Sequence, residues 1–315
     1  MRAAISSAPV MTTDWQFACP ACHVPLDCSD SSLSCPSCAA VYERCDGIVS
    51  LLLSSRREYF STFLREYTRI RLAEGRGAQP PSYFLRLPEC DPTHPMAWQW
   101  RIRRCTVRAF DRSVGLPQGS KVLDLGSGCG WFSNHLAFAG YHPCAVDVTV
   151  DEQDGLGAAR HYEAEWPRVQ AEFDDLPFPD RSVDAVVYNA SLQYSTNYAR
   201  TLREALRVLR PGGRIVVLET PIYKRAESGA RMAAERHQQF EKRYGTRSDS
   251  VPSIEYLTWE MLQNLGGELS LDWRVFRPWY GLKWALRPWI ARLKRKREPS
   301  TFAILIATRK ESSGQ

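Results

Sequence analysis

Apolar and polar positions follow two different periods along the second half of the chain. Short apolar runs of strand length lie at 122–125, 144–147, 185–189 and 214–219, and two more lie near 271–277 and 301–308. Other segments repeat apolar residues at the three- and four-residue spacing of amphipathic helices, at 131–139, 155–166, 198–209 and 228–244. Strands separated by helices predict an α/β fold with a doubly wound, mostly parallel sheet.

The N-terminal part of the chain has a different pattern. Aromatic and aliphatic residues recur at helical spacing over 56–72, which predicts an amphipathic helix. Glycines and prolines between 75 and 81 break this pattern, and we expect a loop that reaches Pro95, followed by a helix over 96–113. We therefore divide the chain into a small N-terminal module (15–54), a helical linker (55–94) and a main domain (95–309).

Composition excludes several classes of protein. The 315 residues are 44% hydrophobic and 24% charged, which is typical of a globular chain and excludes a disordered one. The longest apolar runs, at 48–53 and 302–307, fall far short of the roughly 20 residues of a membrane-spanning helix. The N-terminus also lacks the apolar core of a signal peptide. We therefore expect a cytoplasmic protein.

Four of the ten cysteines form two close pairs, in the pattern Cys-x2-Cys-x12-Cys-x2-Cys made by Cys19, Cys22, Cys35 and Cys38. This pattern has the ligand number and the pairing of a closed tetrahedral zinc site. We expect a structural Zn²⁺ there, because four thiolates leave no coordination position for a reacting water. A module of about 30 residues buries too little apolar area to fold alone, so the metal would supply the missing stability.

A glycine-rich turn follows the first expected strand of the main domain. The sequence Val-Leu-Asp-Leu-Gly-Ser-Gly-Cys-Gly-Trp at 122–131 joins a buried strand to a helix. Glycines allow positive φ angles and close approach of a ligand, and the start of the helix offers free N–H groups. A dinucleotide fingerprint needs Gly or Ala where this chain has Trp131, so the spacing disfavours NAD.

The turn and the segments after it resemble, in the family's order, the motifs of class I S-adenosylmethionine (SAM) dependent methyltransferases with a methyltransferase type 11, UbiE-like core. Further matching segments are Asp147 at the end of the second strand, Leu-Pro-Phe at 176–178 and Pro-Gly-Gly at 211–213. The resemblance covers 95–309. It implies a seven-stranded Rossmann-like sheet that binds SAM.

The resemblance also implies a set of cofactor-binding residues. The carboxylate of Asp147 would accept hydrogen bonds from the ribose hydroxyls. Glu172 and Phe173 would meet the adenine, although the family has Asp where this chain has Glu172, so Asp174 is an alternative. The other implied contacts are Asp124, Gly126, Ser127, Gly128, Gly130 and Asn189. For Asp124, a helix-capping role is the alternative.

Methyl transfer from a sulfonium is an in-line displacement, so the site must mainly align the acceptor and exclude water. A hydroxyl acceptor also loses a proton, and the candidate bases are Tyr194, His237 and Glu219. We expect Gln193, Tyr194 and Tyr223 to line the acceptor pocket. Ordinary packing is the alternative role for each of these side chains.

The segment with the paired cysteines, from Phe17 to Ile48, resembles the zinc ribbon of Trm112-like proteins and of bacterial 23S rRNA guanine methyltransferases. In the rRNA enzymes the ribbon helps to grip RNA, which makes RNA a candidate partner. Residues 15–47, however, contain only Arg44 as a basic side chain, against the acids Asp27, Asp30, Glu43 and Asp46. An acidic ribbon is a poor phosphate clamp.

The positive charge of the chain is concentrated in one segment. The formal net charge is +6, yet residues 277–297 alone hold eight Lys or Arg and no acid. Four aromatic residues interleave with these cations: Trp279, Tyr280, Trp284 and Trp289. Such a mixture suits an anionic membrane surface, single-stranded nucleic acid or a phosphorylated substrate. The alternative is an insertion that packs its Trp side chains on the sheet.

Three hypotheses for the function follow. The first is a SAM-dependent methyltransferase that acts on a small-molecule or lipid-linked metabolite. The second is an rRNA or tRNA base methyltransferase, and the third is a SAM-binding zinc-ribbon adaptor without catalysis. The intact glycines of the turn and Asp147 count against loss of the cofactor site. The sequence sets neither the acceptor atom nor the oligomeric state, because acceptor pockets are built from loops.

Overall fold

One mixed β-sheet of eleven strands runs through the part of the chain that the computed structural model describes, residues 15–29, 31–77 and 79–310. Seven of these strands follow the order β7-β6-β5-β8-β9-β13-β12. Their bounds are β5 Lys121–Leu125, β6 His142–Asp147, β7 Arg168–Gln170, β8 Val183–Asn189, β9 Leu209–Leu218, β12 Leu271–Phe276 and β13 Ile304–Arg309. All pair in parallel except β13, which runs antiparallel to both neighbours. The predicted doubly wound, mostly parallel α/β sheet is confirmed.

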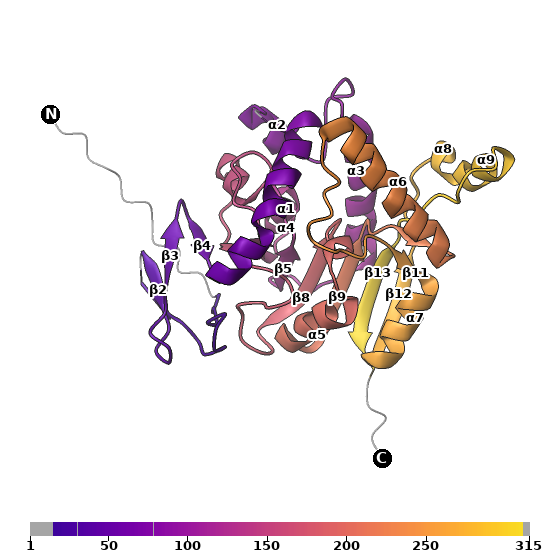
Figure 1. The fold of residues 1–315 in the computed structure, drawn as a ribbon. Helices are drawn as coiled ribbons and strands as arrows, with labels where there is room; N and C mark the ends of the chain where they lie inside the picture. Colours follow the sequence, from indigo (N-terminus) through magenta and orange to yellow (C-terminus); the bar gives the residue numbers. More distant parts are fainter. Residues whose placement is uncertain (1–14, 30, 78, 311–315) are drawn as a thin grey trace, which may run out of the picture.

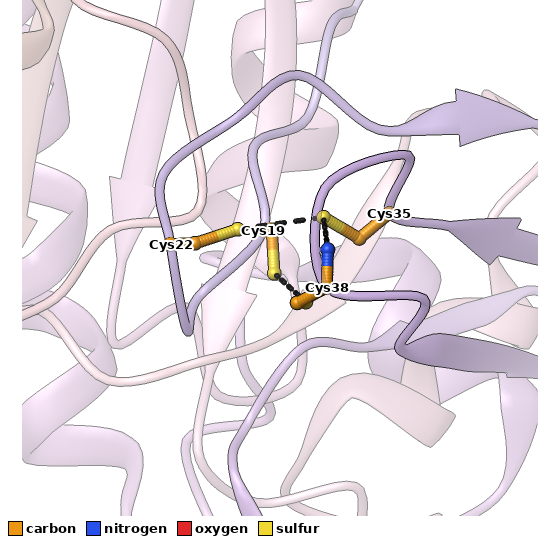
Figure 2. Close-up of side chains that lie close together, drawn as sticks. All are labelled: Cys19, Cys22, Cys35 and Cys38. Carbon is orange, nitrogen blue, oxygen red and sulfur yellow. Dashed lines mark hydrogen bonds between the residues drawn. The ribbon is translucent and has the colours of Figure 1, made fainter.

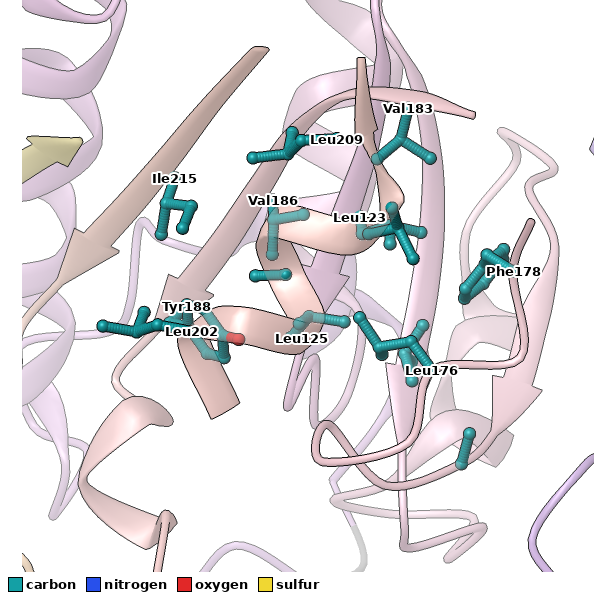
Figure 3. Close-up of a cluster of buried hydrophobic side chains, with 14 of the residues drawn as sticks. Leu123, Leu125, Leu176, Phe178, Val183, Val186, Tyr188, Leu202, Leu209 and Ile215 are labelled. Atoms are coloured by element: carbon teal, nitrogen blue, oxygen red, sulfur yellow. The ribbon is translucent and has the colours of Figure 1, made fainter. Parts of the chain in front are cut away.

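Helices cover both faces of this sheet (Figure 1). On one face lie α3 (Ala97–Ser113) and α4 (Trp131–Phe138), and on the other lie α5 (Tyr198–Val208) and α7 (Trp259–Glu268). Strand side chains alternate between the two cores, as the two-residue period of a strand requires. Figure 3 shows the core on the α5 side, where Leu123, Leu125 and Tyr188 are fully buried.

The remaining elements connect and flank the sheet. They are α1 Ser54–Ala73, α2 Pro81–Arg86, α6 Ala226–Tyr244, α8 Leu282–Ala285, α9 Arg287–Leu293, a parallel pair of β10 Ile222–Tyr223 with β11 Leu257–Thr258, and two short 3₁₀ helices, Leu156–His161 and Leu192–Tyr194. None of the described helices combines the length and the apolar character that a bilayer crossing needs.

Two expectations from the sequence differ from the structure. The helix expected over 155–166 is only the 3₁₀ turn Leu156–His161, because Pro167 disfavours helical backbone at Trp166 and the chain must extend into β7. The loop expected up to Pro95 contains α2, which begins with Pro81 at its first position, where proline is well tolerated.

The cysteine module continues the sheet at its β7 edge. Its strands are β1 Asp27–Cys28, β2 Ser32–Ser34, β3 Val41–Cys45 and β4 Ile48–Ser50, and they form an antiparallel series. The last of them, β4, pairs in parallel with β7, with Val49 opposite Val169. The module therefore shares one hydrogen-bonded sheet with the main domain.

Phe178 fills the junction between the module and the main domain. Its fully buried ring lies 5.7 Å from the ring centroids of both Trp15 and Phe17, and the Ala18 N–H donates to the Pro177 carbonyl at 2.9 Å. These aromatic contacts join the cysteine module to the main domain, so each part contributes to the stability of the other.

We expect Phe178→Ala to lower the free energy of unfolding by about 3–5 kcal/mol, because it leaves a cavity at this junction. Phe138→Ala is the matched control, since Phe138 is 71% exposed and its loss should cost less than about 0.5 kcal/mol. Urea unfolding followed by circular dichroism measures both. Equal destabilisation by the two substitutions would contradict the assigned role of Phe178.

Candidate functional site

The main cavity of the described chain opens at the carboxyl ends of the central strands β5, β6 and β8. It encloses about 1210 Å³, including its open mouth. Its floor comes from the turn after β5, from Asp147 at the end of β6, from 171–174 and from 189–191 after β8. Ligands of open parallel sheets bind outside the carboxyl ends of the strands, so the topology alone places a site here.

The glycine turn after β5 has a backbone that only glycine adopts comfortably. Gly126 and Gly128 have φ angles of +72° and +54°, in the left-handed region. A Cβ at position 126 would also lie 2.4 Å from the Cβ of Ser191. The turn therefore brings bare backbone to the cavity wall, beside the N-terminus of α4.

Asp147 is held in place by the turn of the neighbouring strand. Its Oδ2 accepts a hydrogen bond from the Gly128 N–H at 2.8 Å, and its Oδ1 accepts one from the Thr149 N–H at 2.9 Å. Burial raises the pKa of this carboxyl to about 6, although both backbone hydrogen bonds oppose the shift. Each carboxylate oxygen keeps a second lone pair, and the side chain lines the cavity.

The segment after β7 supplies a second acid, and this acid is already paired. Both oxygens of Glu172 accept hydrogen bonds from the Arg56 guanidinium of α1, at 2.6 Å each. Phe173 stacks edge-on against Tyr188, and the Asp174 carboxylate accepts a hydrogen bond from the Thr201 hydroxyl. All three residues expected to meet an adenine line the cavity. Glu172 keeps one lone pair on each oxygen for a ligand.

Helix α1 covers the cavity with an aromatic face. A role of this face in a ligand site was not predicted from the sequence. Tyr59, Phe60, Phe63, Leu64 and Tyr67 of this helix all line the cavity. The rings of Phe63 and Tyr67 also pack edge-on against Tyr194, with centroid distances of 5.9 and 6.3 Å. The same residues are the apolar positions from which a helix over 56–72 is predicted. Their spacing shows that the helix has an apolar face, but it does not show that this face covers the cavity.

Half-buried cations also line the cavity. Arg71 pairs with Asp154 at 2.8 Å, and Arg103 stacks on Trp100 with its guanidinium carbon 4.4 Å from the ring centroid. The nearest acid to Arg103 is Glu219, at 3.9 Å. The side chain of Arg103 is 15% exposed and lines the cavity. This wall is suited to an anionic group of a ligand.

The structure places the predicted catalytic and acceptor-pocket residues in different environments. Tyr194 lies on the cavity wall, whereas Gln193 and Tyr223 are outside its lining. Glu219 is buried beside Arg103, and burial raises its pKa. His237 lies on α6 and pairs with Glu255 at 2.6 Å, also outside the cavity lining. These placements make Tyr194 the candidate with direct access to a ligand in this cavity.

Of the remaining predicted cofactor-binding residues, Ser127 and Asn189 line the cavity, whereas Asp124 and Gly130 lie behind it. Asp124 is fully buried and accepts a hydrogen bond from the Ser133 hydroxyl of α4 at 2.7 Å. Burial raises the pKa of Asp124 to about 7. This side-chain contact ties β5 to α4, the first helix after the turn.

The four paired cysteines converge on one point (Figure 2). The sulfur atoms of Cys19, Cys22, Cys35 and Cys38 all lie within 4.8 Å of one another. The Cys19 and Cys38 sulfurs are 3.7 Å apart, and the Cys22 and Cys35 sulfurs are 3.4 Å apart. A tetrahedral ion with bonds of about 2.3 Å to sulfur requires separations of about 3.8 Å. The cluster is therefore already close to the geometry of a four-thiolate metal site.

We expect Arg56→Ala to lower the free energy of unfolding by about 1–3 kcal/mol, because it leaves the buried Glu172 carboxylate unpaired. Arg65→Ala on the same helix is the control, since Arg65 is exposed and its side chain donates a hydrogen bond to Thr62 of the same helix. Thermal unfolding at neutral pH measures the difference. Equal melting temperatures of the two variants would show that the ion pair between Arg56 and Glu172 does not stabilise the fold.

The cavity lies within the part of the chain that resembles known proteins. Residues 123–217 match the family described as a methyltransferase domain. The chain is 38% identical over 123 residues to the demethylmenaquinone methyltransferase of Clavibacter sepedonicus, which covers 38% of this chain and 46% of that protein.

Two further relatives show the same extent of similarity. The malonyl-(acyl-carrier protein) O-methyltransferase of Erwinia billingiae is 35% identical over 102 residues, 31% of this chain and 38% of its own length. UbiE of Haemophilus ducreyi is 34% identical over 128 residues, 38% of this chain and 48% of its own length. The chain spans less than half the length of these relatives. Its residues 123–217 form a methyltransferase domain, set in a Rossmann-like α/β sheet.

Proposed function

We propose that this chain is a SAM-dependent methyltransferase that acts on a small-molecule or lipid-linked acceptor. One observation supports the proposal most: the glycine turn after β5 and the acid at the end of β6 meet in the main cavity through the hydrogen bond from Gly128 to Asp147. The turn and the acid come from neighbouring strands, so their meeting is a property of the fold.

The residues present fit SAM. The Ser127 hydroxyl oxygen is buried in the cavity wall and has no hydrogen-bond partner in the described chain, as expected of a group awaiting a ligand. Asp147 can accept hydrogen bonds from ribose hydroxyls, and Glu172 with Phe173 can meet the adenine. Arg103 is available for the methionine carboxylate.

SAM would supply an electrophilic methyl group on a sulfonium. The side chains of this chain bind and orient the reactants: Asp147 and the glycine turn fix the nucleoside, and α1 covers the cavity and excludes water. Tyr194 lines the cavity, where its hydroxyl can orient an acceptor by hydrogen bonding. Since Glu219 and His237 lie outside the lining, a proton released by the acceptor would pass to solvent, directly or by a relay in which the Tyr194 hydroxyl accepts it and releases its own proton.

The cavity lining supports an apolar acceptor. Phe60, Phe63 and Leu64 of α1, together with Val251, give the side under the helix an aromatic and aliphatic surface. One relative is named for demethylmenaquinone, one for ubiquinone and menaquinone biosynthesis, and one for a malonyl-(acyl-carrier protein), and these names support the proposal. A flat or chain-like apolar acceptor fits this surface.

We also propose that the cysteine cluster holds one structural Zn²⁺. Two of the sulfur separations, 3.4 and 3.7 Å, are close to the value of a tetrahedral site, and four thiolates are a soft donor set that suits zinc. The Tyr42 hydroxyl lies 3.0 Å from the Cys19 sulfur, so it can donate a hydrogen bond to a coordinated thiolate.

Asp147→Asn should weaken SAM binding about tenfold or more at pH 8, because an amide offers a single neutral acceptor in place of a carboxylate. In the unmodified protein, burial raises the pKa of Asp147 to about 6, so the acceptor charge is complete above that pH and is lost as the pH falls through it. SAM affinity should therefore fall below pH 6.

Isothermal titration calorimetry with SAM across this pH range tests the assignment. Asp151→Asn is the control, since this acid lies outside the cavity lining and only accepts backbone hydrogen bonds from its own loop. Failure of SAM to bind the folded protein would overturn the proposed function. Binding that is unchanged in Asp147→Asn would overturn only the ribose contact.

Purified protein should contain zinc at a one-to-one ratio, and Cys35→Ser should lose it, because the change removes one of four thiolates. Cys45→Ser is the matched control: Cys45 is exposed and lies outside the cluster. Elemental analysis by mass spectrometry measures both. Full zinc occupancy in Cys35→Ser would show that another set of ligands holds the metal.

A further inference from the structure

The basic segment between β12 and β13 projects from the body of the protein. Its two short helices, α8 and α9, lie apart from the layers that flank the sheet (Figure 1). The Leu286, Ile290 and Lys294 N–H groups donate to the carbonyls four residues before them, and Leu286, between the two helices, has αR backbone, so 282–294 is one nearly continuous helical stretch. The side chains of this stretch can therefore be assigned to helical faces.

The outward face of this stretch is a stripe of large apolar side chains, which we call the apolar stripe. Successive members lie three or four residues apart, as one helical face requires, except for the adjacent pair Trp289 and Ile290. They are Leu282 (71% exposed), Leu286 (51%), Trp289 (70%), Ile290 (45%) and Leu293 (85%), with Trp279 (66%) just before the helix. Among the described residues, no other segment exposes so many large apolar side chains in one run.

The inward face is anchored to the body, so the apolar stripe has a fixed direction. The Tyr280 hydroxyl lies 3.0 Å from the Thr106 hydroxyl of α3, and the ring of Trp284 packs 5.3 Å from that of Phe302. The Arg287 guanidinium covers Trp284 and donates a hydrogen bond to the Ser300 carbonyl at 2.8 Å. The alternative that this segment packs its tryptophans on the sheet therefore does not describe Trp279 and Trp289, which are exposed, while Trp284 packs against Phe302 just before β13.

Cations flank the apolar stripe. Lys283, Arg292 and the run 294–296 are exposed, and 277–297 contains no acid. At about 100° per residue, Lys283 and Lys294 lie on one flank of the stripe and Arg292 on the other. Long basic side chains at such positions can reach lipid phosphates while the stripe enters the interface.

We propose that α8 and α9 dock the protein on the surface of an anionic phospholipid membrane, with the apolar stripe inserted at the level of the headgroups. Both elements of interfacial binding are present, an apolar area to bury and cations to pair with the lipid charge. The proposal concerns this segment alone and does not depend on the cofactor or the acceptor of the main cavity.

The composition of the face favours lipid over the other partners. Single-stranded RNA stacks on flat aromatic rings, and four of the six exposed apolar side chains are aliphatic Leu or Ile, which offer no stacking surface. A second copy of the chain would bring two sets of uncompensated cations together, which opposes self-association. An anionic membrane satisfies the aliphatic face and the cations at once.

Sedimentation with vesicles tests the proposal on the full chain. Vesicles of phosphatidylcholine alone are compared with vesicles that also contain phosphatidylglycerol, at low and high salt. We expect binding to the anionic vesicles to be about tenfold or more tighter, and to weaken with salt.

The double variant Trp289→Ser with Leu293→Ser should reduce binding to the anionic vesicles about tenfold or more, without lowering the melting temperature. The matched control is Trp98→Ser with Phe138→Ser, which removes exposed apolar side chains elsewhere (57% and 71% exposed). The triple variant Lys294→Gln, Arg295→Gln and Lys296→Gln should remove the preference for anionic vesicles.

Three outcomes would overturn the proposal. The first is no sedimentation with either vesicle at low salt. The second is equal binding by the stripe variant and the control variant. The third is a different partner for the same face: a dimer, or a complex with polyuridylate, that depends on Trp289 and Leu293 in the absence of vesicle binding.

Discussion

The parallel pairing of β4 with β7 is the constraint on which the site depends. Strand β7 is only three residues long, and in the described chain it holds β6 on one side and β4 on the other. Helix α1 begins four residues after β4, so the direction of β4 decides where α1 goes. In this arrangement α1 passes over the carboxyl ends of the strands and closes the cavity with Phe63 and Tyr67. A strand of the cysteine module thus positions a wall of the main cavity.

The ion pair between Arg56 and Glu172 fixes the same arrangement from the other side. Glu172 lies two residues after β7, and Arg56 lies in the first turn of α1, so the pair joins the end of the shared strand to the start of the covering helix. Glu172 is buried, so leaving its carboxylate unpaired would be costly, whereas the Arg56 side chain is 35% exposed and keeps contact with solvent. If the cysteine cluster holds the proposed Zn²⁺, its loss would act on the cavity through this route, because β4 belongs to the cysteine module.

The sequence predicted the parts of the site that follow from local chemistry. Gly126, Gly128 and Asp147 could be recognised because positive φ angles and a buried strand-end acid leave a signature in a few adjacent residues. The four cysteines of the cluster could be recognised for the same reason, because they form two Cys-x2-Cys pairs within twenty residues of sequence. The role of α1 could not be predicted, since the periodic pattern shows that a helix has an apolar face but not what that face covers. Strand β7 was missed because three residues carry too little pattern. For Gln193 and Tyr223, side-chain direction after a strand depends on loop geometry, and the roles expected of them stay predictions.

The two additions to the central sheet occupy its two opposite edges. The cysteine module joins at β7, whereas α8 and α9 are inserted between β12 and β13 at the other end of the strand order. These two strands pair over six residues in unbroken antiparallel register, so the ends of the insertion are held together by the sheet itself. A connection closed in this way can grow without shifting its neighbours, because the cost of lengthening a loop rises only slowly with length. The sheet can therefore carry α8 and α9 at one edge without displacing β5, β6 and β8, which form the cavity floor.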